Sequence, residues 1–327
     1  MGGFLEELGK KLAERWLSLL VLPGVLYLAI ATTAATLGHR HALDVPYLTA
    51  RVTSWTTTPA ATGAGGQVVL VAAVLAAAAG VGLATQGVGS AAERLILAAD
   101  WRTWPGPLRR LARRRVTSRR TRWDMAHAEY HRLYHQAEQA RRSGTSPDSE
   151  LRARRHLSYR TYTRICLEPP DRPTWSGDRV NAAVIRLDRV LQVDLPTIWP
   201  TLWLHLPDTT RTEITTARSA LSRATSLIGW SLLYLPLTGW WWPAVLISTV
   251  LAGVAWQRIR ATAGAYALLL EAATHLHLAG LAENLGVDTT GKTPSAIGQT
   301  LTHLLHTPPL SATDLPARIP SASPPAT

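Results

Sequence analysis

The chain has 327 residues, a formal net charge of +12 and a mean hydropathy of +0.03, and Cys166 is its only cysteine. A single cysteine excludes an intramolecular disulfide, so the fold does not depend on an oxidising compartment. We interpret Cys166 as a thiol without a catalytic role, since no Cys/His pattern of a known nucleophile surrounds it. All but three of the 34 basic residues are arginine, a bias typical of a GC-rich bacterial coding sequence.

Three long stretches contain no Asp, Glu, Lys or Arg, and they cover residues 16–39, 52–92 and 224–257. An α-helix needs about 20 apolar residues to cross a hydrocarbon core about 30 Å thick. No segment shows the sustained alternation of a half-buried strand. The sequence therefore predicts an all-α polytopic membrane protein, with four transmembrane helices and a helical cytoplasmic domain inserted between spans 2 and 3.

The first two predicted spans are 16–38 and 67–89, and an extracytoplasmic loop over 39–66 joins them. The stretch 224–257 would be about 51 Å long as one straight helix, so it predicts a hairpin of two spans that turns between Pro236 and Pro243. Tryptophan prefers the membrane–water interface. The predicted interface anchors are Trp16, Trp240, Trp241 and Trp242.

The distribution of arginine and lysine predicts the orientation. Residues 90–223 contain 25 of the 34 basic residues, whereas the loop 39–66 contains only Arg40 and Arg51. Basic residues are enriched in cytoplasmic loops of membrane proteins. We therefore expect a bacterial cytoplasmic (inner) membrane protein with both its N-terminus and its C-terminus inside the cell.

The remaining segments complete the predicted organisation. Residues 1–15 are typical of an amphipathic surface helix, and 307–327 form a Pro-rich, disordered tail. Residues 258–306 are predicted as a cytoplasmic helical tail that continues the fourth span. A fifth span over 261–282 stays open, although Glu271 would be costly at the centre of a bilayer.

The basic domain over 90–223 is predicted to be helical throughout. Breakers delimit helices at about 108–142 and 148–167. Ser176 is predicted to cap a third helix. Thr210 and Glu213 match a capping box, which should open a helix that runs directly into the third span.

Eight arginines fall within the 14 residues from 109 to 122, without an acidic residue among them. They are Arg109, Arg110, Arg113, Arg114, Arg115, Arg119, Arg120 and Arg122. Just inside a span, such a segment is typical of contact with anionic lipid headgroups. A cationic vestibule that draws anions toward a pore is the alternative, and nucleic-acid binding is disfavoured.

Residues 286–293 match the phosphate-loop pattern G-x-x-x-x-G-K-[ST], with Gly286, Gly291, Lys292 and Thr293 at the defining positions. A true phosphate loop follows a strand, whereas the residues before Gly286 are predicted to be helical. We therefore favour another interpretation, in which Gly286 ends one helix and Thr293 caps the next. A nucleotide-binding protein that uses this loop is the weakest of the functional alternatives.

Three histidines, His127, His131 and His135, recur every fourth residue on one predicted helix face. Two of them could bind zinc, but no H-E-x-x-H is present, and a solvated or partner-facing helix explains them better. The sequence predicts no catalytic residue, no cofactor and no metal site. The protein is therefore predicted not to be an enzyme.

Three features of the sequence resemble a pattern in other proteins. They are PTWSGDR at Pro173–Arg179, IWPTLW at Ile198–Trp203 and the tryptophan hairpin. They resemble a recurring pattern in uncharacterised actinobacterial four-span membrane proteins over most of residues 150–290, which implies a shared architecture and no assigned activity. The order of two spans, a helical insert, two spans and a helical tail is similar to bestrophin-type anion channels, at the level of layout.

Two functions follow as hypotheses. The first is a homo-oligomeric membrane platform that contacts anionic lipids and recruits a cytoplasmic protein partner. The second is an anion channel or pore-forming membrane effector, with its spans around a symmetry axis. Neither the oligomer number nor the identity of a partner follows from the sequence.

Overall fold

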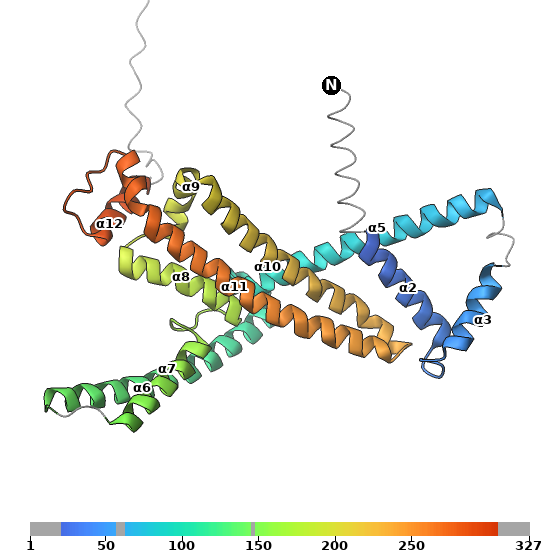
Figure 1. Cartoon of the computed structure of the whole chain (residues 1–327), viewed down its shortest axis with the longest axis horizontal. Coiled ribbons are helices and arrows are strands. Elements are labelled where there is room, and N and C mark those ends of the chain that lie inside the picture. Colours follow the sequence, from blue (N-terminus) through green and yellow to red (C-terminus); the bar gives the residue numbers. More distant parts are fainter. Residues whose placement is uncertain (1–20, 57–62, 145–147, 307–327) are drawn as a thin grey trace, which may run out of the picture. The chain divides into compact units, whose positions relative to one another are not determined.

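A computed structural model describes residues 21–56, 63–144 and 148–306 (Figure 1). These residues are helical with short connections and contain no strand, which confirms the all-α prediction. The predicted surface helix 1–15, the anchor Trp16 and the tail 307–327 lie outside the described residues. The α-helices are α2 (Leu22–Leu37), α3 (Val45–Thr56), α5 (Ala64–Leu97), α6 (Gly106–Arg142), α7 (Ser149–Ile165), α8 (Trp175–Leu191), α9 (Leu195–His205), α10 (Asp208–Tyr234), α11 (Pro243–Asn284) and α12 (Pro294–Leu305).

Helix α5 is long and apolar enough to cross a membrane over Gly65–Leu97, and only 17% of its most apolar 18-residue window is buried. The side chains of Val68, Val69, Leu70 and Val71 are between 57% and 70% exposed. Helix α2 is apolar but has only 16 described residues. Among the described residues, α5 is the one helix that meets the length and composition of a span, and the other three spans stay a prediction.

Small residues let α2 and α5 pack closely. A Cβ atom on Gly24 of α2 would collide with the backbone of Ala78 in α5, and Ala78 is fully buried. Small side chains at a helix contact allow this close approach. Gly80 of α5 has no atom within 4 Å of its added Cβ position, so its side of the helix has no packed neighbour in the described part of the chain.

Helices α10 and α11 form an antiparallel hairpin joined by the 3-10 turn η3 (Pro236–Gly239), as the prolines predict. Helix α10 runs unbroken to Tyr234, but it begins at Asp208. The predicted cap at Thr210 is therefore wrong, because Thr210 already lies in the first helical turn. Helix α11 continues to Asn284 and includes the residues of the open fifth span, 261–282.

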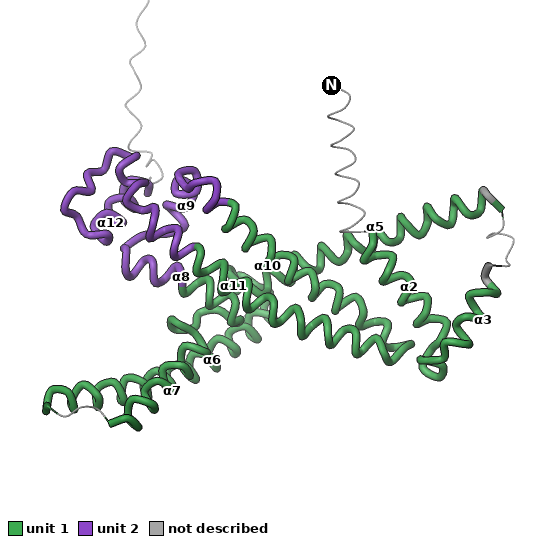
Figure 2. The backbone as a smooth tube through the Cα atoms, viewed as in Figure 1, with its two compact units in different colours: residues 1–182, 212–269 green, residues 183–211, 270–327 purple. Residues whose placement is uncertain are grey.

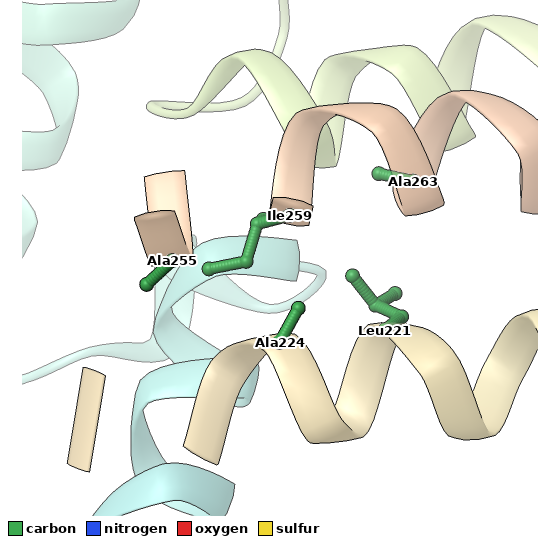
Figure 3. Close-up of a cluster of buried hydrophobic side chains, with 5 residues drawn as sticks. All are labelled: Leu221, Ala224, Ala255, Ile259 and Ala263. Atoms are coloured by element: carbon green, nitrogen blue, oxygen red, sulfur yellow. The ribbon is translucent and has the colours of Figure 1, made fainter. Parts of the chain in front are cut away.

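A core of small and branched side chains joins α10 to α11 near the end of α5. Figure 3 shows its five members, Leu221, Ala224, Ala255, Ile259 and Ala263, each at most 3% exposed. Ile96 and Leu97, the last residues of α5, pack against this core. Farther along the hairpin, the buried Ser231 and Ser248 each donate a hydroxyl proton to the other residue's carbonyl oxygen at 2.9 Å.

Helices α6 and α7 lie side by side as a second antiparallel hairpin (Figure 1). Aromatic side chains fill the seam between them: Trp123 packs edge-on against Tyr162 at 6.2 Å, and Tyr130 lies 5.2 Å from Tyr162. The bounds agree closely with the predicted helices 108–142 and 148–167. The seam explains why such a polar pair of helices stays associated.

The chain divides into two compact units (Figure 2). Unit 1 contains residues 1–182 and 212–269, and unit 2 contains 183–211 and 270–327. In unit 2, Gly298 of α12 packs against the carbonyl oxygen of Leu191 and the side chain of Val193. Both Val193 and Leu301 are fully buried there.

Candidate functional site

The candidate site is a cleft in unit 1, lined by six arginines and two tryptophans. It has two adjoining lobes of about 660 and 340 Å³, which share five lining residues. We call it the arginine cleft and define it by Arg114, Arg115, Arg119, Arg122, Arg164, Arg260, Trp175 and Trp256. Helix α6 contributes four arginines, the end of α7 one, the start of α8 Trp175, and α11 the remaining two residues.

The connection between α7 and α8 builds one wall of the cleft. Trp123 donates its indole proton to the carbonyl oxygen of Cys166 at 2.9 Å, and Arg172 donates to the carbonyl oxygen of Leu97 at 2.8 Å. Thr174 donates its hydroxyl proton to the carbonyl oxygen of Ile96. The last carbonyls of α5, which lack helical partners, are thereby satisfied, and the start of α8 is held against the end of α5.

Thr174 also caps α8. Its hydroxyl oxygen accepts a hydrogen bond from the backbone N–H of Gly177 at 3.0 Å. The predicted cap at Ser176 is therefore wrong, because the helix begins one residue earlier and Ser176 is buried within its first turn. A Cβ atom at Gly177 would lie 2.6 Å from the carbonyl oxygen of Leu97, so the segment PTWSGDR needs glycine at this close approach.

Asp178 anchors Arg119, one of the residues that line the cleft. Its side chain is 1% exposed and forms a salt bridge of 2.8 Å with Arg119, whose side chain is 17% exposed. The other carboxylate oxygen accepts the backbone N–H groups of Asp171 and Arg172, at 2.9 and 2.7 Å. Burial raises the pKa of the Asp178 carboxyl, and these partners oppose that shift.

Arg119 is held from two sides. Besides the contact with Asp178, its Nη2 donates to the carbonyl oxygen of Ile165 at 3.2 Å. Arg260 is held by stacking, with its guanidinium carbon 4.1 Å from the centre of the Trp175 ring and 5.8 Å from that of Trp256. The Trp175 indole in turn donates to the carbonyl oxygen of Arg164 at 3.2 Å. Two of the six arginines of the cleft, Arg119 and Arg260, are therefore fixed in position by the fold.

The positive charge of the cleft is poorly neutralised. Asp178 pairs with Arg119, and none of the other five arginines forms an ion pair with a carboxylate in the part of the chain that the structure describes. Burial, followed by the positive charges of Arg164 and Arg119, lowers the pKa of the Arg260 guanidinium. Like charges at close range repel, so the arrangement favours an anion between them.

The predicted polybasic segment is thus divided by the fold. Arg114, Arg115, Arg119 and Arg122 line the cleft. The other four, Arg109, Arg110, Arg113 and Arg120, are exposed and lie outside its lining. Sequence reasoning missed Arg164, Arg260, Trp175 and Trp256 as site residues, because their proximity depends on tertiary packing. The sequence segment that came nearest was PTWSGDR, which includes Trp175 and Asp178.

The phosphate-loop pattern connects two helices of unit 2. Gly286 has φ +76° just after α11, and Thr293 caps α12, where its hydroxyl accepts from Ala296 at 3.4 Å. The loop's own turns use its N–H groups, since Thr290 donates to the Asp288 carboxylate and Lys292 to the carbonyl oxygen of Thr289. The helical interpretation of these residues agrees with the structure, and this loop has no strand before it.

The histidines lie on α6, where His127 stacks on Trp123 at 4.2 Å and its Nε2 is 3.2 Å from that of His131. Burial and the charge of His131 lower the pKa of His127. His135 lies 6.1 Å from His131 between ring centres. Within residues 21–56, 63–144 and 148–306, no cluster of three metal-ligating side chains occurs.

The tryptophan triplet lies at the turn of the α10–α11 hairpin. Trp240 and Trp242 are 62% and 45% exposed. Trp241 is partly buried and donates its indole proton to the carbonyl oxygen of Ala42 at 2.8 Å. Two of the three residues therefore have the exposure that an interface anchor needs.

Comparisons with known proteins found no matching family model, no matching curated protein and no matching solved structure. The resemblance to actinobacterial membrane proteins and the similarity of layout to bestrophin-type channels therefore stay predictions.

Proposed function

We propose that this chain is a non-enzymatic, homo-oligomeric integral membrane protein that serves as a platform for a cytoplasmic protein partner. The observation that carries this proposal is the exposure of α5. A water-exposed helix normally buries one apolar stripe, but α5 leaves Val68, Val69, Leu70 and Val71 uncovered together. Hydrocarbon is the solvent that suits such a surface.

The exposed side chains of the α10–α11 hairpin also suit a bilayer. Its outer face exposes Leu232, Val245, Leu246 and Val250, between 45% and 64% of each side chain. Each hydroxyl of the buried pair Ser231 and Ser248 donates a hydrogen bond to the opposite helix. Polar groups inside a bilayer need such partners within the protein. We propose four spans, 16–38, 67–89 and the hairpin 224–257, in a bacterial inner membrane with both termini inside.

The proposed platform is the α6–α7 hairpin. Beyond the aromatic seam it exposes apolar and aromatic side chains, with Met125 62%, Leu157 63% and Tyr159 45% exposed. The exposed arginines outside the cleft suit anionic lipid headgroups, at about 1 kcal/mol for each basic residue near the surface. Lipid contact would hold this hairpin near the membrane while its apolar residues contact a protein.

The experiment removes exposed apolar side chains from this hairpin. A Met125→Ser, Leu157→Ser variant changes two exposed positions, leaves Trp123, His127 and Tyr162 together and should insert normally. After in-cell cross-linking, we expect the unaltered protein to purify with a cytoplasmic protein that the variant has lost. A matched control carries Leu304→Ser on the exposed face of α12 and should retain the partner; an identical set of cross-linked proteins for all three would contradict the platform.

The arginine cleft favours one alternative, an anion channel built around an axis between subunits. Guanidinium groups beside a pore attract anions. Within one chain, Gly89 and Gly229 bring α5 and α10 close together, so this pair of helices provides no pore by itself. Chloride flux into liposomes that contain the purified protein would favour the channel, and flux equal to that of empty vesicles would reject it.

A further inference from the structure

The arginine cleft has more positive charge than the fold needs for its own stability. Arg119 has its carboxylate partner, and Arg260 is placed by stacking on Trp175. Arg122 and Arg164 are exposed side chains whose guanidiniums make no ion pair among the described residues. Two such arginines, converging from α6 and from the end of α7 on one cleft, indicate a ligand that carries negative charge.

A terminal phosphate can contact more of these guanidiniums at once than a carboxylate can. A guanidinium binds two oxygens of a phosphate side by side through parallel N–H bonds. One carboxylate offers two oxygens and one charge, whereas a terminal phosphate offers three oxygens and a charge near −2. Arg119, Arg122, Arg164 and Arg260 surround the larger lobe, so a group with several oxygens can satisfy them together.

The size and the walls of the cleft agree with a small organic phosphate. Its lobes of about 660 and 340 Å³ lie in the range of small-molecule sites. The rings of Trp175 and Trp256 form an aromatic wall that can contact the apolar part of a ligand. Trp256 and Gln257 end the uncharged stretch 224–257, and Arg260 follows three residues later.

We propose that the arginine cleft binds the terminal phosphate of a phosphomonoester or a diphosphate group. Two sources present this chemistry, a lipid headgroup such as that of phosphatidic acid and a soluble phosphate. The lipid source rests on the proposed function, because it requires the end of the 224–257 hairpin to lie at the inner membrane surface. The soluble source requires only the fold of unit 1.

The test uses the purified full chain at about 150 mM salt, where the Debye length is about 8 Å and distant charges are screened. In one arm, calorimetry measures inorganic pyrophosphate binding to the detergent-solubilised protein. In the other, binding is compared between nanodiscs of phosphatidylcholine with phosphatidic acid and nanodiscs with phosphatidylserine, which is anionic but lacks a terminal phosphate.

Arg122→Gln with Arg164→Gln is the principal variant, because both side chains are exposed and their loss should leave the fold intact. Arg152→Gln with Arg154→Gln removes the same charge from exposed positions of α7 outside the cleft. We expect the first pair to weaken binding at least tenfold and the second less than twofold. Arg260→Gln, checked for an unchanged melting temperature, should weaken binding as well.

Each outcome decides the proposal. Pyrophosphate binding that depends on the cleft supports a soluble phosphate, and cleft-dependent preference for phosphatidic acid supports a lipid headgroup. Binding in neither arm, or an equal loss with both double variants, would overturn the proposal. Equal affinity for phosphatidic acid and phosphatidylserine without pyrophosphate binding would also overturn it, as it would show a general attraction to charged surfaces. If the protein binds pyrophosphate but proves not to be inserted in a membrane, the phosphate-binding proposal stands and only the proposed membrane function is rejected.

Discussion

The Asp178→Ala variant is expected to lose about 3 to 5 kcal/mol of folding free energy, the usual result of removing one partner of a buried ion pair. The change would leave the largely buried Arg119 guanidinium without its carboxylate, and the N–H groups of Asp171 and Arg172 without their acceptor. Because these groups connect α6 to the start of α8, the loss should also release Arg119 from its fixed position in the arginine cleft.

The measurement is the midpoint of thermal unfolding in detergent, which is monitored by intrinsic tryptophan fluorescence. Asp178→Asn should lose less than Asp178→Ala, because its amide oxygen can still accept the two backbone N–H groups. Asp171→Asn is the matched control, since its salt bridge with Arg102 joins side chains that are 42% and 71% exposed and should contribute less than about 1 kcal/mol. Equal midpoints for the Asp178 and Asp171 variants would show that the buried pair does not stabilise the fold.

The Gly298→Ala variant is expected to destabilise unit 2 by about 1 to 3 kcal/mol, the usual cost of overpacking a core. The added Cβ atom would collide with the carbonyl oxygen of Leu191 and lie 2.5 Å from Cγ2 of Val193. Backbone and a fully buried side chain cannot move aside as a flexible surface side chain can. Helix α12 should therefore shift away from the segment that follows α8.

Gly264→Ala is the matched control, because the same substitution in α11 meets no atom within 4 Å. Alanine is about 0.5 to 1 kcal/mol more favourable than glycine inside a helix, so this variant should be slightly more stable than the unaltered protein. Limited proteolysis, read as the rate of cleavage next to α12, compares the two variants. A Gly298→Ala protein that is cleaved no faster than the Gly264→Ala protein would contradict the close packing of α12.

The sequence was sufficient to predict turns and helix ends that depend mainly on neighbouring residues. The prolines of 236–243 predict the turn of the α10–α11 hairpin, and Thr293 with Pro294 predicts the start of α12. The caps at Ser176 and Thr210 were wrong for a related reason. Several residues near each helix start can act as a cap, and tertiary contacts, such as that of Thr174 with the end of α5, decide which one does.

The site was predictable only in part. The run of eight arginines over 109–122 can be recognised in the sequence alone, and four of them line the cleft. Arg164 and Arg260 lie 96 residues apart in the numbering, and no periodicity relates them. They come together because the segment after α7 is fixed to the end of α5 and because α11 returns beside α10 through the core at Leu221 and Ile259.

The central claim is that the apolar helices lie in a bilayer, with the α6–α7 hairpin inside the cell and the tryptophan turn outside. Cys166 makes a direct measurement feasible, because it is 5% exposed and burial raises the pKa of its thiol to about 11, so the folded protein should react slowly with maleimides. Trp240 and Met125 are matched positions, each 62% exposed. In intact cells, a membrane-impermeant maleimide should label the Trp240→Cys protein and should label the Met125→Cys protein only after permeabilisation. Labelling of the Met125→Cys protein in intact cells, at the rate seen for Trp240→Cys, would contradict the account.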